Sequence, residues 1–206
     1  GWAADIPAPA HIELFAQVPD SLRLPFPPGV TARQKRPEGH DPHFWTDPVT
    51  VKAVIPPLID EFCDLMPARC SAFEANGSTF ATTLDSLHQV LRVQTKPIHD
   101  QPILLATPFL QYFLHRYHLN LAGVIEPIPG REMAPRTLQE VIQTTRELES
   151  GVILAARQLP VRIARTVSDE SGFPLYQMDF IGDERRTPTY EKLMLDNTRR
   201  LLNALD

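Results

Sequence analysis

Ten residues of the chain, "GHDPHFWTDP" at positions 39 to 48, combine two histidines with two Asp-Pro steps. Imidazole nitrogens and carboxylate oxygens are common ligands of zinc and other transition metals, so His40 and His43 make this segment a candidate metal-binding corner. The same residues also fit a stiff, proline-restrained turn in front of a helix. The segment alone leaves both interpretations open, and the decision depends on what the rest of the chain brings to His43.

Further candidates follow four short apolar runs that we interpret as buried strands, at residues 102–106, 121–125, 151–155 and 174–178. The residues just past the ends of these runs are Thr107, Glu126, Ala156 and Asp179. Ligand sites of parallel sheets lie beyond the carboxyl ends of the strands. We therefore expect Thr107 and Asp179 to face one crevice, and to meet His43 if the N-terminal part of the chain folds over the sheet.

The elements that position these residues alternate along the second half of the chain. Helical apolar spacing and prolines at the starts predict helices at 108–117, 135–149, 160–171 and 188–205. Strands that alternate with helices indicate right-handed crossovers and a parallel sheet. The predicted fold class is therefore α/β, with residues 98–206 forming a complete four-stranded lobe.

The first half of the chain is less regular. Most of its prolines precede residue 60, so we expect irregular chain up to about residue 50. Thr46 or Asp47 can cap a helix with Pro48 at its first position, and Pro56 and Pro57 must kink or restart that helix. A second helix over 68–95 reaches about 40 Å, which suggests a strut between two lobes.

These patterns divide the chain into three parts. Residues 1–69 form a partial N-terminal lobe, residues 70–97 a linking helix, and residues 98–206 the α/β lobe. The two cysteines, Cys63 and Cys70, flank the expected helix boundary. A disulfide in an oxidising compartment and a pair of buried free thiols fit this spacing equally well.

Composition excludes several classes of function. The net charge of -5 argues against a protein that binds nucleic acid. No apolar run approaches the roughly 20 residues that span a bilayer. "GWAADIPAPA" lacks the pattern of a signal peptide. This is also what the sequence would look like after a signal peptide had been removed. Because the common hydrolase and phosphate-binding motifs are absent, we do not expect an enzyme.

Five segments, in the right order, resemble the periplasmic zinc- and manganese-uptake solute-binding proteins of ABC transporters. "DPHFWTDP" resembles the Asp-Pro-His-x-Trp-x-Asp-Pro segment of that family, and the stretch that starts "MPARCSAFEANGSTF" resembles its long linking helix. The other three matching segments are "TPFLQYFLHRYHL", "GVIEPIPGREMAPRTLQEVI" and "QMDFIGDERRTPTYEKLMLDNTRRLLNAL". The resemblance covers almost the whole chain and implies a TroA-like fold, in which the long helix joins a partial first lobe to a C-terminal lobe with a four-stranded parallel sheet.

The same resemblance implies where a metal would bind. Family members hold Zn²⁺ or Mn²⁺ between two lobes with three histidines, or two histidines and a Glu, plus an Asp. The second ligand position falls on His43, the last on Asp179, and the third, five residues before Tyr112, on Thr107. The first belongs to a region before this chain starts, because "GW" resembles the stretch after the early strands of the first lobe.

Threonine is a poor zinc ligand, so the expected site depends on substitutes. His40 lies three residues before His43, where the family often carries a histidine-rich loop, and Glu126 is a second candidate. The predicted metal residues are therefore His43, Asp179, His40 and Glu126, with Thr107 in the same cleft.

Two functions follow from the resemblance. The first is an extracytoplasmic, periplasmic receptor that delivers zinc or manganese to an ABC permease, which His43 and Asp179 favour. The alternative is a scaffold of TroA-like fold that lost its metal site and acts through protein contacts, which Thr107 favours. An incomplete first lobe also exposes apolar surface, so self-association is expected.

Overall fold

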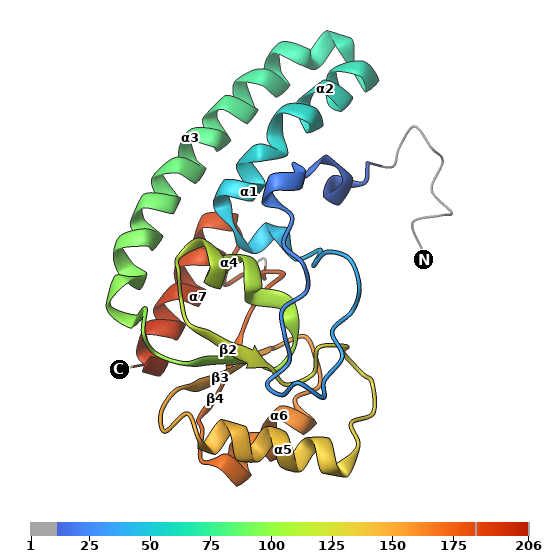
Figure 1. Ribbon diagram of the computed structural model, residues 1–206. Coiled ribbons are helices and arrows are strands. Elements are labelled where there is room, and N and C mark those ends of the chain that lie inside the picture. The colour runs from blue at the N-terminus through green and yellow to red at the C-terminus, as the bar shows by residue number, and fades with distance from the viewer. Residues whose placement is uncertain (1–11, 184, 206) are drawn as a thin grey trace.

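The computed structural model describes residues 12–183 and 185–205 (Figure 1). Gly1 and Trp2, which we expect to correspond to the stretch after the early strands of the first lobe, lie outside the described residues. Residues 12 to 47 run as irregular chain with three 3-10 turns, at Leu14–Gln17, Asp20–Leu22 and Phe44–Thr46. This agrees with the prediction from the density of prolines in this part of the sequence.

Four parallel strands form the sheet, in the order β2-β1-β3-β4. Their bounds are Ile103–Leu105 for β1, Leu121–Val124 for β2, Val152–Ala156 for β3 and Leu175–Met178 for β4. Leu105 pairs with both Val124 and Leu154, and Ala156 pairs with Met178. All strands point the same way, so their carboxyl ends lie along one edge of the sheet.

Helices cover both faces of the sheet, which explains why the strands are apolar runs rather than alternating patterns. Their bounds are Gln111–Arg116 for α4, Pro135–Arg146 for α5, Arg162–Ser171 for α6 and Tyr190–Leu205 for α7. Ile103 and Leu105 of β1 pack toward α4 and α7, whereas Leu104 packs toward α5 and α6. The helices are shorter than predicted; Pro108–Leu110 forms a 3-10 turn before α4, for example.

The N-terminal segment contacts one edge of the sheet, at the end of β2. The N–H of Val124 donates to the carbonyl of Pro28 at 3.1 Å, and the N–H of Val30 donates to the carbonyl of Val124 at 3.2 Å. Gly123 adopts φ +150, and a Cβ there would lie 2.8 Å from the Cα of Val30. Glycine at 123 therefore allows the N-terminal backbone to approach β2 and to pair with its last residue, Val124.

The long helix predicted from the sequence is present. Helix α3, Cys70–Thr95, has 26 residues and spans about 39 Å. Two shorter helices precede it, α1 (Pro48–Ala53) and α2 (Ile55–Leu65), and the prolines at the start of α2 mark the expected break between them. Helices α2 and α3 lie side by side and project away from the sheet (Figure 1). The C-terminal half of α3 buries the side chains of Leu84, Leu87 and Leu91.

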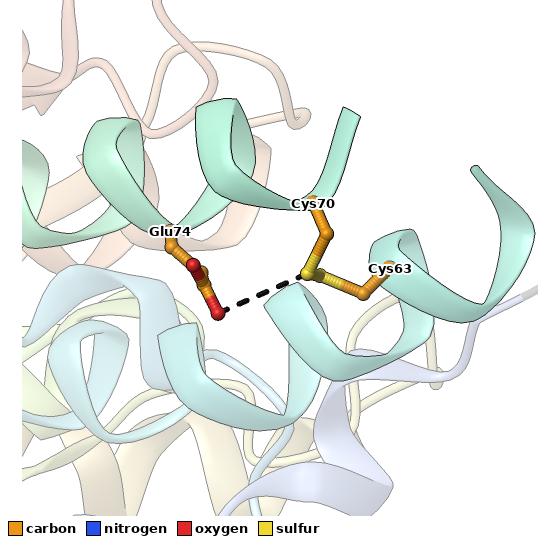
Figure 2. The surroundings of a disulfide bond; sticks show 3 residues. All are labelled: Cys63, Cys70 and Glu74. Carbon is orange, nitrogen blue, oxygen red and sulfur yellow. Dashed lines mark hydrogen bonds between the residues drawn. A yellow bond between two sulfur atoms is a disulfide. The ribbon is translucent and has the colours of Figure 1, made fainter. Parts of the chain in front are cut away.

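A disulfide joins Cys63 of α2 to Cys70 at the start of α3, with Cα atoms 4.5 Å apart (Figure 2). Of the two states that the sequence left open, the structure has the bonded one. Close packing of the two helices continues at Gly77, where a Cβ would lie 2.2 Å from Cδ1 of Ile59.

The division of the chain at residues 69 and 97 stays a prediction. None of the described helices combines the length and the apolar character needed to cross a membrane.

Candidate metal centre

His43 is oriented by a carboxylate two residues earlier in the chain. Asp41 is fully buried, and its Oδ1 contacts Nδ1 of His43 and accepts a hydrogen bond from the His43 backbone N–H at 3.1 Å. A carboxylate beside Nδ1 favours the tautomer that carries its proton there, which leaves the lone pair of Nε2 free for a ligand bond. The His43 side chain is 26% exposed and packs edge-on against Trp45.

Asp41 did not emerge as a candidate from the sequence, and its buried position depends on distant residues. The Tyr112 hydroxyl donates to the Asp41 carbonyl at 3.0 Å and accepts from the Leu24 N–H at 3.0 Å. The Asp41 N–H in turn donates to the Leu24 carbonyl at 2.9 Å. Among the described residues, Oδ2 of Asp41 has no hydrogen-bond partner. The Asp that precedes Pro42 in the decapeptide is the signal that would have found this group.

The second Asp-Pro step anchors the decapeptide. Asp47 is buried and caps α1 by accepting from the Val49 N–H at 2.9 Å and from the Thr50 hydroxyl at 2.7 Å. Arg116 of α4 donates to the same carboxylate through Nε at 2.9 Å and Nη2 at 2.7 Å. This two-pronged ion pair fixes the corner to the helix that follows β1.

Two hydrogen bonds bring the decapeptide to the last quarter of the chain. The Trp45 indole N–H donates to the Phe180 carbonyl at 3.1 Å, and the Tyr190 hydroxyl donates to the Trp45 carbonyl at 2.9 Å. His43 is two residues before Trp45, and Asp179 directly precedes Phe180. The two residues predicted to converge therefore lie on segments in direct contact, although no hydrogen bond joins their side chains in the described part of the chain.

Asp179 follows β4 and is 7% exposed. Its Oδ1 accepts from the Gly182 N–H at 3.0 Å, the Ile181 N–H at 3.2 Å and the Gln158 amide at 2.5 Å. Nη2 of Arg157 lies 3.1 Å from Oδ2. Burial by itself raises the pKa of Asp179, but the hydrogen bonds and the guanidinium together lower it below its ordinary value. The carboxylate is therefore charged and already paired with a cation of the chain.

Thr107 and Glu126 lie just past the ends of β1 and β2, as predicted, and the structure shows that these two strands are neighbours. The Glu126 N–H donates to the Ala106 carbonyl at 2.9 Å, and both side chains line a cavity of about 590 Å³. Thr107 is 5% exposed, and its hydroxyl has no hydrogen-bond partner among the described residues. Burial raises the pKa of Glu126, an effect that the charge of Arg162 partly offsets.

His40 lies apart from these groups. It is exposed and pairs with Pro25 in an isolated antiparallel bridge. Within residues 12–183 and 185–205, no three His, Cys, Asp or Glu side chains are grouped closely enough to hold a metal ion. The structure thus offers one oriented imidazole and one paired carboxylate on adjoining segments, and the predicted set of His43, Asp179, His40 and Glu126 stays a prediction.

Comparison with known proteins identifies the lineage of this arrangement. The sequence model described as "Zinc-uptake complex component A periplasmic", ZnuA, matches residues 8–204. The chain belongs to the ZnuA family. This confirms the resemblance seen in the sequence, and it makes the protein a member of a family of periplasmic, metal-binding solute-binding proteins of ABC transporters.

Individual relatives within and around the ZnuA family are distant. The "High-affinity zinc uptake system protein ZnuA" of Brucella abortus is 24% identical over 81% of this chain and 49% of its own length. The ZnuA of Brucella suis gives the same figures. The chain therefore spans about half the length of the curated relatives it matches.

Solved structures confirm the TroA-like fold. The periplasmic zinc-binding protein TroA of Treponema pallidum superposes with a TM-score of 0.77 at 17% identity, over 94% of this chain and 71% of that one. The solute-binding protein FpvC of Pseudomonas aeruginosa, in complex with Mn²⁺, gives 0.76 at 25% identity, over 94% and 70%. The fold class predicted from the sequence, α/β with a long helix and a four-stranded parallel sheet, is correct.

Proposed function

We propose that the protein is an extracytoplasmic solute-binding protein that captures a divalent transition metal and delivers it to an ABC permease. The observation that carries this proposal is the contact between Asp41 and His43, which leaves Nε2 of an oriented imidazole free. A buried carboxylate behind a histidine is the arrangement that positions and strengthens metal-binding imidazoles in proteins. Membership of the ZnuA family supports the same function.

Zinc is the metal that this site favours over manganese. Imidazole nitrogen suits Zn²⁺, whereas Mn²⁺ prefers carboxylate, carbonyl and water oxygens. In the proposed site, Nε2 of His43 and Oδ2 of Asp179 bind the ion, with Thr107 in the same cleft. His40, Glu126 or a further segment of a longer chain completes the ligand set.

The proposed location is the periplasm or another extracytoplasmic compartment. The disulfide between Cys63 and Cys70 fits such a location, because disulfides persist where the surroundings are oxidising.

The scaffold alternative is not favoured, since a protein that acts only through its surface gains nothing from a carboxylate that orients His43. Self-association stays a prediction, which light scattering of the purified chain tests.

Titration calorimetry of Zn²⁺ into the chelator-treated protein tests the proposal. We expect micromolar or tighter binding, which corresponds to about 8 kcal/mol or more. His43→Ala should abolish it, and Asp41→Asn should weaken it by about tenfold, the lower end of the effect expected when the partner of a ligating histidine is lost. His115→Ala, which removes an exposed histidine of α4, is the matched control and should bind as the parent does. Absence of binding heat in the parent protein would falsify the metal-capture function.

A further inference from the structure

A carboxylate lies against the disulfide at the end of the α2–α3 pair. Oε1 of Glu74 is 3.8 Å from Sγ of Cys70, and both residues belong to the first two turns of α3 (Figure 2). Cys63 reaches the same point from α2, with its Cα 4.5 Å from that of Cys70. Two sulfur atoms and a carboxylate oxygen, contributed by two helices, therefore meet at one place on the surface.

The chemistry of this group depends on the state of the two sulfurs. In the structure they are bonded to each other, so the three side chains are not a metal site in this state. Reduction adds two electrons and two protons and yields two thiols, which give up their protons when a metal binds. Thiolate sulfur and carboxylate oxygen are both common ligands of Zn²⁺. Two thiolates and a carboxylate match a three-ligand zinc site whose fourth position is taken by water.

The distances at the end of the helix pair suit a zinc ion. Zn²⁺ binds sulfur at about 2.3 Å and carboxylate oxygen at about 2.1 Å, so a tetrahedron places these two atoms about 3.6 Å apart. The separation of 3.8 Å between Cys70 Sγ and Glu74 Oε1 is close to this value. Two thiolates on the same ion lie about 3.8 Å apart. The sulfurs must therefore separate, which rotation of the two cysteine side chains allows once the bond is open.

Packing next to the disulfide keeps α2 against α3 when the bond opens. The rings of Phe62 and Phe73 lie with their centroids 5.4 Å apart. Ile59 packs against the backbone of α3 at Gly77, where a Cβ would lie 2.2 Å from its Cδ1. Neither contact involves a sulfur atom. We therefore expect the two cysteines to stay opposite each other in the reduced protein.

The charge of this part of the α2–α3 pair favours a cation. Between residues 55 and 80 the sequence has four carboxylate side chains and one cationic side chain, and all five residues are exposed. They are Asp60, Glu61, Asp64, Glu74 and Arg69. The excess of negative charge raises the local concentration of Zn²⁺ and repels anions. Arg69, directly before Cys70, offsets only a part of this field.

We propose that Cys63, Cys70 and Glu74 form a zinc site that exists only when the disulfide is reduced. A dithiol opens the bond by thiol–disulfide exchange: its two electrons and two protons pass to the cysteine sulfurs, and the dithiol becomes a disulfide. Zn²⁺ then displaces the two thiol protons and binds both thiolates and Oε1 of Glu74. The bound ion joins α2 to α3 in place of the disulfide. The site shares no residue with the proposed centre around His43 and does not depend on it.

Calorimetric titration of Zn²⁺ into chelator-treated His43→Ala tests this inference, because that variant lacks the imidazole of the other proposed site. The protein is titrated in the oxidised state and after reduction by a phosphine, which takes an oxygen atom from water and becomes its oxide. We expect the reduced protein to bind one more Zn²⁺ per chain than the oxidised protein. Co²⁺, as a second probe, should give the charge-transfer absorption of a thiolate ligand in the reduced protein alone.

Three variants of the His43→Ala protein, titrated with the phosphine present, identify the ligands. Cys63→Ser with Cys70→Ser should lose the additional ion. Glu74→Gln keeps the size of the side chain but replaces the carboxylate by a weaker amide ligand, so we expect about tenfold weaker binding. Glu61→Gln is the matched control, because it removes the same charge from the neighbouring helix α2. It should bind the additional ion as tightly as the His43→Ala protein does.

The outcomes separate this inference from the metal-capture function. Equal numbers of bound ions in the reduced and oxidised proteins overturn it, whether or not His43 binds zinc in the parent. An additional ion that persists in the double serine variant overturns it as well, and equal affinities of Glu74→Gln and Glu61→Gln remove Glu74 from the ligand set. Uptake by the reduced protein alone, with no binding to the oxidised parent, refutes the metal-capture function and leaves the redox-dependent site standing.

Discussion

The guanidinium of Arg157 lies against the carboxylate of Asp179, with Nη2 3.1 Å from Oδ2. The pair forms because β3 and β4 are neighbours in the sheet and both residues follow the ends of those strands. Oδ1 already accepts hydrogen bonds from Gln158 and from the turn after Asp179. In the proposed metal site, the oxygen that Arg157 holds is therefore the one that binds the cation.

Removing this guanidinium should strengthen metal binding. In Arg157→Gln, Oδ2 of Asp179 is freed and the local positive charge is lost, so we expect the zinc affinity to rise by about tenfold. The stability change should stay below about 1 kcal/mol, since the Arg157 side chain is 38% exposed and water screens the pair. Calorimetry measures the effect, with Arg69→Gln, which removes an exposed arginine of the turn before α3, as the control. Equal affinities in the parent and in Arg157→Gln would show that Arg157 does not compete with the metal.

Asp179 should make the fold sensitive to acid. Its pKa in the folded protein lies below its ordinary value of 3.8, so the charged form stabilises the fold above that value. This contribution disappears as the pH falls through the lower, folded pKa. We expect the melting temperature of the parent to exceed that of Asp179→Asn at pH 6, and the difference to shrink steadily below about pH 3.8. A difference that stays constant from pH 6 to pH 2 contradicts the prediction.

The ion pair between Asp47 and Arg116 should dominate the stability of the histidine corner. The Asp47 side chain is 2% exposed, so Arg116→Ala leaves a buried charge without its cation. We expect a loss of about 3 kcal/mol in the free energy of unfolding, measured by urea denaturation. Arg136→Ala removes a side chain that is 78% exposed and should cost less than about 1 kcal/mol. Similar losses in the two variants would show that burial of Asp47 is not the deciding factor.

The disulfide should stabilise the fold without changing the affinity for zinc. It closes a loop between residues only seven apart, so we expect Cys63→Ser with Cys70→Ser to lower the free energy of unfolding by about 2 kcal/mol. The bond lies at the end of the α2–α3 pair that is remote from the sheet (Figure 1). Zinc affinity in the double variant should therefore equal that of the parent. A change in affinity would mean that this end of the helix pair communicates with the cleft.

The elements of the fold were predictable because their signals are local. Short apolar runs marked the four strands, and Pro48 marked the start of α1 at the correct residue. The break near Pro56 was equally visible, because proline has no N–H to continue a helix. Helix ends were less accurate, since Glu149 adopts φ 61 and the chain leaves α5 before it.

The details of the site depend on contacts between distant parts of the chain. Asp41 acquires its role only when Tyr112 and Leu24 bury it, 71 and 17 positions away. Arg157 reaches Asp179 through the pairing of β3 with β4, which the spacing of the two residues does not reveal. Whether Cys63 and Cys70 bond was likewise undecided, because it depends on how closely α2 and α3 pack.

The hydrogen bonds that join Trp45 to Phe180 and Tyr190 to Trp45 bear on the proposed metal capture. They hold the histidine corner against the end of β4 before any ion arrives. The conformational entropy lost in aligning these two segments is thus part of the cost of folding, so the proposed metal site is preorganised. In the proposed site, the metal reaches Oδ2 of Asp179 only after the Arg157 side chain has moved away from it.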